Sequence, residues 1–282
     1  MSAPSPLDHV LRAVTEDGSF RVIAVNATET VRGIVAAQRA QGAIVPILGD
    51  LVVATILLRE LMSPELRVQG IMFGETERGR LVADAHPDGI TRGLVQLPAG
   101  ATFVPHHLQM MRTLRNGAIQ QGVVAVPQHG DVAAGMMEYL QTSEQLVSTT
   151  ALTTLVEGDH VRAAGGFVVQ LLPEATRGPL AAMTDRLRAM PAIAHLLEQG
   201  QGPETLLRDI LEGMPYARTA ESNVRFGCTC SEGRLMASLA TLPASELQSM
   251  VDDGEVLDVA CEYCGKKYPI SPEQLRGMLA KN

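Results

Sequence analysis

Four cysteines near the C-terminus form two closely spaced pairs, and they are the only cysteines in the 282-residue chain. One residue separates Cys228 from Cys230, and two residues separate Cys261 from Cys264. One such pair can occupy two vertices of a tetrahedron around a metal ion, and a second pair can close the other two. No histidine lies between Asn223 and the C-terminus, so no local imidazole competes as a ligand. The spacing predicts a four-cysteine site for one Zn²⁺ ion.

The residue that follows the second pair is Gly265. Glycine adopts positive φ without steric cost, so the chain can turn there and direct backbone N–H groups back toward the sulfurs. We therefore expect a tight turn directly after Cys264 as part of the site.

Four cysteines could instead form two structural disulfides, as they do in small secreted domains. The cellular compartment decides between the two interpretations. Residues Met1–Val14 contain no basic or apolar segment of the kind that directs export. The longest apolar region, Ile44–Leu58, is interrupted by proline, glycine and aspartate and is too short to span a bilayer. These features predict a cytoplasmic protein, in which thiols stay reduced and paired cysteines bind metal.

The charge balance argues against a nucleic-acid partner. The formal net charge is -8, whereas binding to a polyanion requires a basic face. Residues 224–282 alone carry six Lys and Arg residues against eight Asp and Glu residues. Aromatic residues make up only 3% of the chain, so stacking platforms for single-stranded nucleic acid are not expected.

Apolar residues that alternate with polar ones in some segments, and recur at helical spacing in others, predict an α+β fold. Strand-like runs follow one another and are separated by glycine and proline turns, which favours an antiparallel sheet with helices packed against it. Thr28 is expected to cap the first helix. The predicted strands are 19–27, 65–73, 80–85, 89–96, 118–126, 149–156 and 161–172, and the predicted helices of this part are 28–40, 48–61 and 131–145. Two adjacent glycines in the last strand, Gly165 and Gly166, predict a bulge or a close backbone approach.

The pattern changes after Pro173, where strand signals give way to short amphipathic helices broken by proline and glycine. Each helix is too short to be stable in isolation, so its apolar face must pack against another part of the protein. An ordinary helical hairpin of the main core is the alternative interpretation. The predicted organisation is an N-terminal antiparallel-sheet core domain over residues 1–175, a metastable helical linker over 176–223 and a small zinc-binding domain over 224–282. The apolar residues at helical spacing are Leu180, Met183, Leu187, Met190, Ile193, Leu196, Leu197, Leu206, Leu207, Ile210 and Leu211.

Catalytic motifs are absent from the sequence. No phosphate-binding loop, dinucleotide-binding glycine motif, nucleophile elbow or H-E-x-x-H pair occurs. Glu144 could act as an acid or base, but no partner lies near it in the sequence. The second cysteine pair resembles a thioredoxin motif only superficially, because no βαβ pattern surrounds it and another pair lies upstream. The sequence predicts no enzyme.

Sulfur chemistry offers another role for the four cysteines. Zinc-bound sulfur is deprotonated, so oxidants attack it directly. Oxidation to disulfides would remove the ligands and release the zinc. Because 59 residues are too few for a generous core, the C-terminal domain should then unfold. Helices docked against that domain would lose their support, and their apolar faces would become available to other proteins.

The chain resembles the redox-regulated chaperones of the heat shock protein 33 family over almost its whole length. The resemblance depends on three motifs whose order and spacing together are specific. They are Cys228-x-Cys230 with Cys261-x-x-Cys264, Ser143-Glu144-Gln145-Leu146, and Ala163-Ala164-Gly165-Gly166-Phe167 followed by Gln170-Leu171-Leu172-Pro173.

The resemblance implies a holdase chaperone that works without ATP and is inactive while reduced and zinc-bound. Oxidants would form Cys228–Cys230 and Cys261–Cys264 disulfides, release the zinc and unfold the linker. The active form would be a homodimer that holds unfolding client proteins and passes them to ATP-dependent chaperones. Two other classes remain open: a zinc-ribbon regulator that binds nucleic acid, and a thiol oxidoreductase with a structural zinc.

Overall fold

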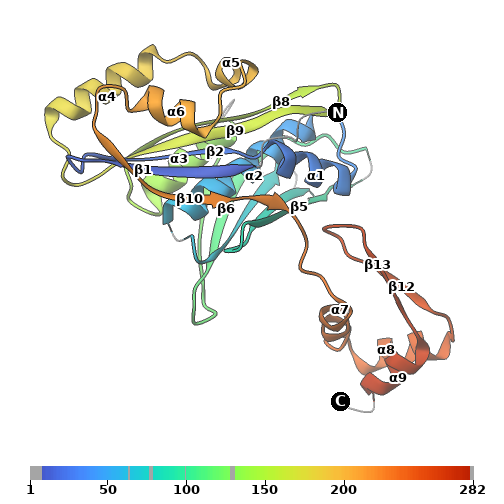
Figure 1. Ribbon diagram of the computed structural model, residues 1–282. Coiled ribbons are helices and arrows are strands. Elements are labelled where there is room, and N and C mark those ends of the chain that lie inside the picture. Colours follow the sequence, from blue (N-terminus) through green and yellow to red (C-terminus); the bar gives the residue numbers. More distant parts are fainter. Residues whose placement is uncertain (1–7, 63, 76–78, 99, 128–130, 280–282) are drawn as a thin grey trace, which may run out of the picture. The chain divides into compact units, whose positions relative to one another are not determined.

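The computed structural model describes residues 8–279 apart from residues 63, 76–78, 99 and 128–130 (Figure 1). The chain divides into two units, Met1–Phe226 and Gly227–Asn282. We call them the core unit and the cysteine unit, and each is described by itself. The first half of the Met1–Val14 segment lies outside the described residues. No described helix has the length and apolar character that a membrane span requires.

The core unit contains two mainly antiparallel sheets, as the sequence predicted. The five-stranded sheet has the order β10 (Tyr216–Asn223), β1 (His9–Thr15), β2 (Phe20–Asn26), β9 (His160–Leu171) and β8 (Ser148–Glu157). The six-stranded sheet has the order β11 (Arg225–Phe226), β5 (Ile90–Gln96), β4 (Arg80–Ala85), β3 (Arg67–Gly74), β6 (Pro105–Thr113) and β7 (Ile119–Ala125). Only the β11–β5 pair is parallel among the described strands. Each predicted strand has an observed counterpart, whereas β1, β6, β10 and β11 were not predicted.

Three helices lie between the two sheets and complete the main hydrophobic core (Figure 1). They are α1 (Thr28–Gln38), α2 (Ile44–Met62) and α3 (Val132–Thr142). The central helix α2 is apolar on nearly every side, and most of its side chains are buried because sheets and helices surround it. Burial of this one helix, which the sequence predicted over residues 48–61, holds the two sheets together.

The start of α1 differs from the prediction. Thr28 is the first helical residue, and its side chain does not cap the helix. The carboxylate of Asp8, which precedes β1, accepts hydrogen bonds from Glu29 N at 3.2 Å and Thr30 N at 2.5 Å. The expected local cap is therefore replaced by a carboxylate that lies 21 residues away in the sequence, a contact that local spacing does not reveal.

The two glycines of β9 confirm a close backbone approach. A Cβ atom at Gly165 would lie 2.6 Å from the carbonyl oxygen of Val25 on β2. A Cβ atom at Gly166 would collide with the carbonyl oxygen of Ala151 on β8. Glycine is therefore required at both positions to let β9 lie between its two neighbours.

A carboxyl group on α2 makes the stability of the core unit depend on pH. Burial raises the pKa of Asp50 to about 7, and hydrogen bonding to Thr154 offsets only part of this effect. Its Oδ1 atom is buried without a hydrogen-bond partner among the described residues. The folded protein therefore holds this proton at pH values where the unfolded chain has released it. Stability should fall as pH rises from about 4 to about 7.

Asp50→Asn should remove this dependence, because the amide stays neutral. We expect the variant to match the wild type near pH 4 and to exceed its unfolding free energy by roughly 3–4 kcal/mol at pH 8. Denaturant unfolding at several pH values measures the difference. Asp185→Asn, at an exposed position of the helical segment, is the control and should leave the profile unchanged. A difference that is equal at every pH would contradict the assignment.

The segment 176–223 contains the predicted helices and one unpredicted strand. The helices are α4 (Arg177–Ala189), α5 (Ile193–Glu198) and α6 (Pro203–Ile210). The expectation of a wholly helical linker is wrong for residues 216–223, which form β10 and pair with β1 along its full length. The side chains of β10 are mostly polar because this strand lies at the edge of the sheet. An alternating apolar pattern was therefore missing from its sequence.

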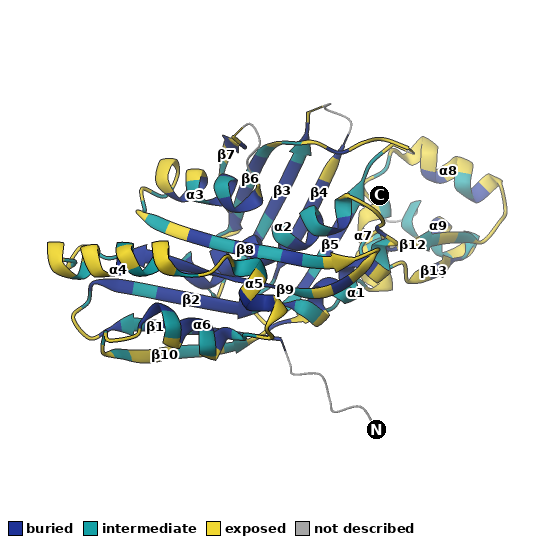
Figure 2. Cartoon of the chain, turned by 90° about the horizontal axis from the view of Figure 1, so that it is seen from above, coloured by how far each residue is buried: buried dark blue, intermediate teal, exposed yellow. Residues whose placement is uncertain are grey.

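The three helices cover the outer face of the five-stranded sheet (Figure 2). Leu206, Leu207 and Ile210 of α6 are fully buried there. They share a second hydrophobic core with Phe20 and Phe167 of the strands. The expectation that these helices dock on the C-terminal domain is wrong, because their apolar faces pack on the core unit's own sheet. We call α4–α6 the helical cover.

The cysteine unit is small and has little apolar interior. It contains α7 (Glu232–Leu239), α8 (Ala244–Asp252), β12 (Leu257–Ala260), β13 (Lys267–Ile270) and α9 (Pro272–Leu279). Its core consists of Leu247, Val251, Ile270 and Leu275, with partly buried neighbours around them. A core of this size supplies little stabilisation by itself.

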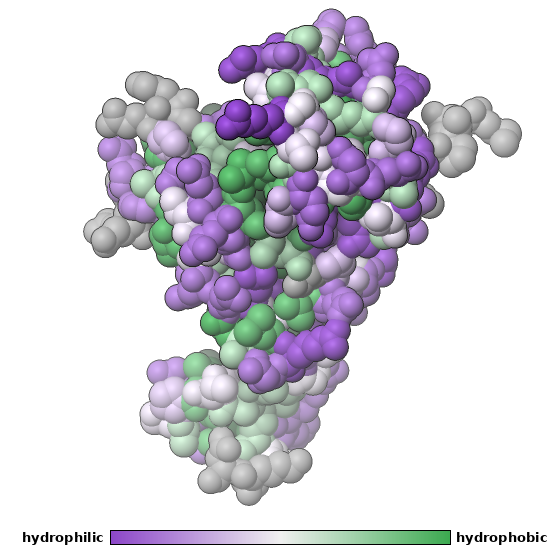
Figure 3. Space-filling view, turned by 90° about the vertical axis from the view of Figure 1, so that its left-hand side faces the viewer, coloured by the Kyte–Doolittle hydropathy of each residue, from purple (hydrophilic) through white to green (hydrophobic). Residues whose placement is uncertain are grey.

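Hydrophilic and apolar residues are unevenly distributed over the face of the molecule shown in Figure 3. On the face shown in Figure 3, hydrophilic residues predominate and apolar residues form smaller patches between them. Most large apolar side chains are therefore turned inward, and the helical cover contributes to this arrangement by burying its apolar residues on the sheet.

Candidate metal centre

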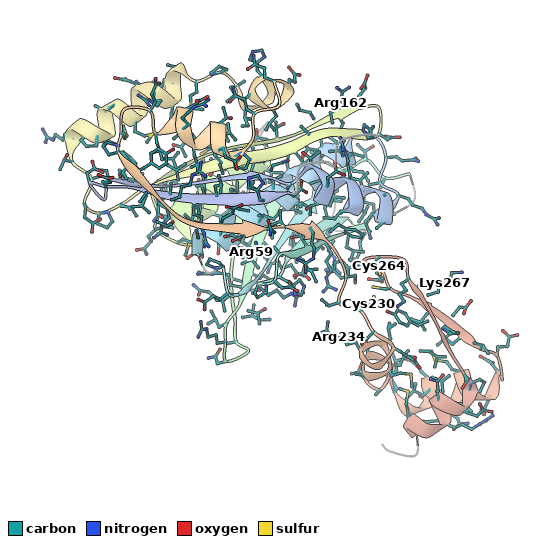
Figure 4. The ribbon with its side chains drawn as sticks, viewed as in Figure 1. Arg59, Arg162, Cys230, Arg234, Cys264 and Lys267 are labelled. Carbon is teal, nitrogen blue, oxygen red and sulfur yellow. The ribbon has the colours of Figure 1, made fainter. Side chains whose placement is uncertain are left out.

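The structure brings the four predicted cysteine ligands together in the cysteine unit. Their sulfur atoms all lie within 4.8 Å of one another. Between the pairs, Cys228 Sγ lies 3.7 Å from Cys261 Sγ, and Cys230 Sγ lies 3.5 Å from Cys264 Sγ. All four are free thiols. Figure 4 shows Cys230 and Cys264 side by side. The prediction that the two pairs converge is confirmed.

The second pair is held by the tight turn that Gly265 permits. Gly265 has a φ of 70°, as its position predicted. Its N–H donates to the carbonyl oxygen of Cys261 at 2.8 Å, and Cys261 N donates to Lys266 O at 2.9 Å. Backbone N–H groups of Tyr263 and Cys264 are directed at the Cys261 sulfur. These dipoles favour negative charge on sulfur, as a metal ligand requires.

The first pair lies between β11 and α7. Ser231 directly follows Cys230 and caps α7 by accepting a hydrogen bond from Arg234 N at 3.3 Å. The Arg234 guanidinium donates to the carbonyl oxygen of Thr229 at 3.0 Å and to its hydroxyl at 2.6 Å. Thr229 separates the two cysteines, so these bonds fix the short loop that presents their sulfurs.

The arrangement fits a tetrahedral zinc ion. With Zn–S bonds of about 2.3 Å, the sulfurs of a regular tetrahedron lie about 3.8 Å apart. The separations of 3.5 and 3.7 Å between the pairs are close to this edge length. Four thiolates are also the donor set typical of structural zinc. The four cysteines can therefore hold a metal ion without rearrangement of the backbone.

Without a metal ion, the pKa values of Cys230, Cys261 and Cys264 are shifted in different directions. Burial raises the pKa of Cys230, but hydrogen bonds from Tyr268 and the neighbouring thiols outweigh it and lower the pKa to about 7. Burial raises the pKa of Cys261 and brings that of Cys264 to about 12. A divalent cation must displace the remaining protons, so metal uptake releases protons and is stronger at higher pH.

A tyrosine that the sequence analysis missed also belongs to the site. The Tyr268 hydroxyl lies 3.1 Å from Cys230 Sγ and 3.1 Å from the carbonyl oxygen of the same residue. Tyr268 lies on β13, 38 residues from Cys230 in the sequence. No spacing rule points to such a contact. The pairing of β12 with β13 brings the Tyr268 side chain close to Cys230.

Glu144, considered as an acid or base, has a structural role instead. Its carboxylate accepts hydrogen bonds from Arg112 at 2.9 Å for each oxygen and from the Tyr139 hydroxyl at 2.6 Å. The Arg112 and Glu144 side chains are 8% and 6% exposed. This buried, fully paired carboxylate joins the end of α3 to β6. The Ser-Glu-Gln motif is thereby explained by packing, because a buried carboxylate must be paired.

Comparisons with known proteins agree with these features. A family model described as Hsp33 protein matches residues 8–271. The 33 kDa chaperonin of Syntrophotalea carbinolica is 32% identical, with 97% of this chain and 99% of the relative covered. The 33 kDa chaperonin of Streptococcus sanguinis is 29% identical with the same coverage. The crystal structure of a 33 kDa chaperonin from Thermotoga maritima has the same fold, with a TM-score of 0.82, 22% identity and coverage of 97% of this chain and 98% of that one.

Proposed function

This chain belongs to the Hsp33 family, and from that premise we propose that it is an ATP-independent holdase chaperone activated by oxidation. In the reduced form, Cys228, Cys230, Cys261 and Cys264 hold one Zn²⁺ ion. Oxidation joins Cys228 to Cys230 and Cys261 to Cys264, which removes the four ligands and releases the ion. The relatives are named chaperonins, in keeping with a role in protein folding rather than catalysis.

The observation that carries the proposal is the convergence of four free thiols in a unit with a very small core. All four sulfurs lie within 4.8 Å of one another, and the hydrophobic core cluster of the unit has four buried residues among those described. A structural zinc contributes about 10–16 kcal/mol in zinc-finger peptides, far more than a core of this size supplies. The order of the cysteine unit therefore depends on the redox state of its sulfurs.

The client surface in this proposal is the apolar interface under the helical cover. The outer face of the five-stranded sheet presents Phe20, Val22 and Phe167, each at most 5% exposed while the cover is in place. Release of the cover would expose this face and the apolar sides of the helices themselves. Two complementary apolar surfaces would then be free to bind segments of unfolding proteins.

The connection from the sulfurs to the helical cover follows the chain. After α6 the chain forms β10 and β11, and Cys228 comes two residues later. Polar β10 is held mainly by backbone pairing with β1 and by bonds such as Thr219 Oγ1 to Arg12 O at 3.3 Å. An edge strand with few buried side chains is a weak point of the sheet. Unfolding of the cysteine unit would extend through β10 into the cover.

We further propose a cytoplasmic location, a homodimer in the oxidised state and transfer of clients to ATP-dependent chaperones after reduction. The paired reduced thiols support the first of these, because they persist in a reducing compartment. The net charge of -8 supports protein clients rather than nucleic acid.

One experiment tests the proposal directly. Zinc release is followed with a chromogenic chelator while light scattering reports aggregation of a thermally unfolding client, before and after treatment with hypochlorite. We expect zinc release and suppression of aggregation to appear together after oxidation. Equal suppression by the reduced and oxidised samples would contradict the switch. Turnover in an insulin-reduction assay would instead favour a thiol oxidoreductase.

A further inference from the structure

The Tyr268 hydroxyl is held against one of the four sulfurs. Its oxygen lies 3.1 Å from Cys230 Sγ, within hydrogen-bonding distance for sulfur. The ring is 7% exposed, and the residue pairs with Val259 in the β12–β13 hairpin. The Lys266 ammonium lies 5.0 Å from the ring centroid. Backbone pairing, burial and this cation–π contact together restrict the hydroxyl to the neighbourhood of Cys230.

The hydroxyl has one proton and two acceptors within reach. The carbonyl oxygen of Cys230 also lies 3.1 Å away. A negatively charged thiolate is a stronger acceptor than a neutral carbonyl, so the proton is directed to sulfur whenever Cys230 is ionised. Cys261 and Cys264 receive backbone N–H groups, which no side-chain substitution removes. The contact with Tyr268 can therefore be removed separately.

We propose that Tyr268 is a positioning residue that slows attack of oxidants and other electrophiles on Cys230 and thereby sets the oxidant dose for the Cys228–Cys230 disulfide. The inference rests on the proposed function and deepens its regulation. A hydrogen bond to a thiolate withdraws negative charge from the sulfur and makes it a weaker nucleophile. As Cys230 reacts, its sulfur loses negative charge and the hydrogen bond from Tyr268 weakens, which raises the barrier to the reaction.

The oxidation step shows why one protected sulfur matters. One thiolate of the pair attacks the chlorine of hypochlorous acid, which forms an S–Cl bond and releases hydroxide. The second thiolate attacks that sulfur, forms the S–S bond and releases chloride. Two electrons leave the two sulfurs and reduce one hypochlorous acid. Cys230 acts as a nucleophile in either order: it attacks the chlorine if it reacts first, and it attacks the sulfur of Cys228 if it reacts second. The hydrogen bond therefore slows disulfide formation in both cases.

Tyr268→Phe in the full-length, zinc-loaded protein tests the inference, because it removes the hydroxyl and keeps the ring. The first readout is zinc content. The second is the rate at which each cysteine is alkylated by N-ethylmaleimide, resolved by mass spectrometry. We expect one zinc per chain and an increase of about tenfold in the rate at Cys230 relative to Cys264, the lower range for a hydrogen bond to a charged acceptor. Zinc release should also need less hypochlorite.

Tyr216→Phe, which removes a hydroxyl from β10 in the core unit, is the matched control and should change neither rate. If Tyr268→Phe lowers the zinc content or raises all four rates equally, the hydroxyl only supports the fold of the loop and the inference fails. Unchanged rates would also overturn it. A selective increase at Cys230 in a protein without oxidant-dependent chaperone activity would uphold the role of Tyr268 while refuting the proposed function.

Discussion

Cys261→Ser should abolish tight zinc binding and unfold the cysteine unit. Cys261 is the most buried of the four cysteines, at 9% exposed. Its carbonyl oxygen and N–H both take part in the turn around Gly265. Serine leaves three sulfurs and a hydroxyl that is not ionised at neutral pH, so the tetrahedral donor set is lost. The unit then depends on a core of four buried apolar residues, Leu247, Val251, Ile270 and Leu275.

The expected loss is large. Structural zinc contributes about 10–16 kcal/mol to folding in zinc-finger peptides, and most of this contribution should disappear. Elemental analysis should find far less than one zinc per chain, and limited proteolysis should cut within residues 227–282. The two sheets with α1–α3 should keep a thermal transition of their own, because the main hydrophobic core contains no residue of the helical cover or of the cysteine unit.

A suitable control adds a serine to the same unit without touching a ligand. Ala237 lies at an exposed position on α7, and the variant Ala237→Ser should leave the zinc content and the protease resistance unchanged. Full zinc content in Cys261→Ser would show that this sulfur is not a ligand, and the four-cysteine assignment would be wrong.

The second large effect is expected from the double variant Leu206→Ala, Ile210→Ala. Both side chains are fully buried between α6 and the five-stranded sheet. Truncation of a buried leucine or isoleucine to alanine costs about 2–5 kcal/mol, so the pair should cost about 4–10 kcal/mol if the two effects add. This is enough to loosen the helical cover, which consists of three short helices that depend on docking.

We expect the double variant to suppress client aggregation at a lower dose of hypochlorite than the wild type, because less free energy is needed to release the cover. Hydrogen exchange of residues 203–211 measures the loosening, and light scattering measures the threshold. Leu180→Ala is the matched control, since Leu180 lies on α4 of the same cover but is 42% exposed. Faster exchange with an unaltered threshold would show that the cover does not gate client binding.

Local patterns predicted the elements whose surroundings are simple. Helix α2 was predicted because it is apolar on nearly every side, which is typical of a helix enclosed by other elements. The meander β3–β4–β5 was predicted because glycine and proline residues separate its strand-like runs in the sequence. In contrast, β10 was read as part of a helical linker, because a polar edge strand lacks the apolar alternation that identifies a strand.

The sequence by itself identified the four candidate ligands, since the chain has only four cysteines and their spacing is compatible with one tetrahedral site. It also determined that the segment after Pro173 forms amphipathic helices with a face to bury. Only the tertiary structure decided which surface receives that face and that Tyr268 contacts Cys230. The physical reason is that spacing encodes which neighbours along the chain share a face. Contacts between residues far apart in the sequence depend on how strands pair and helices pack.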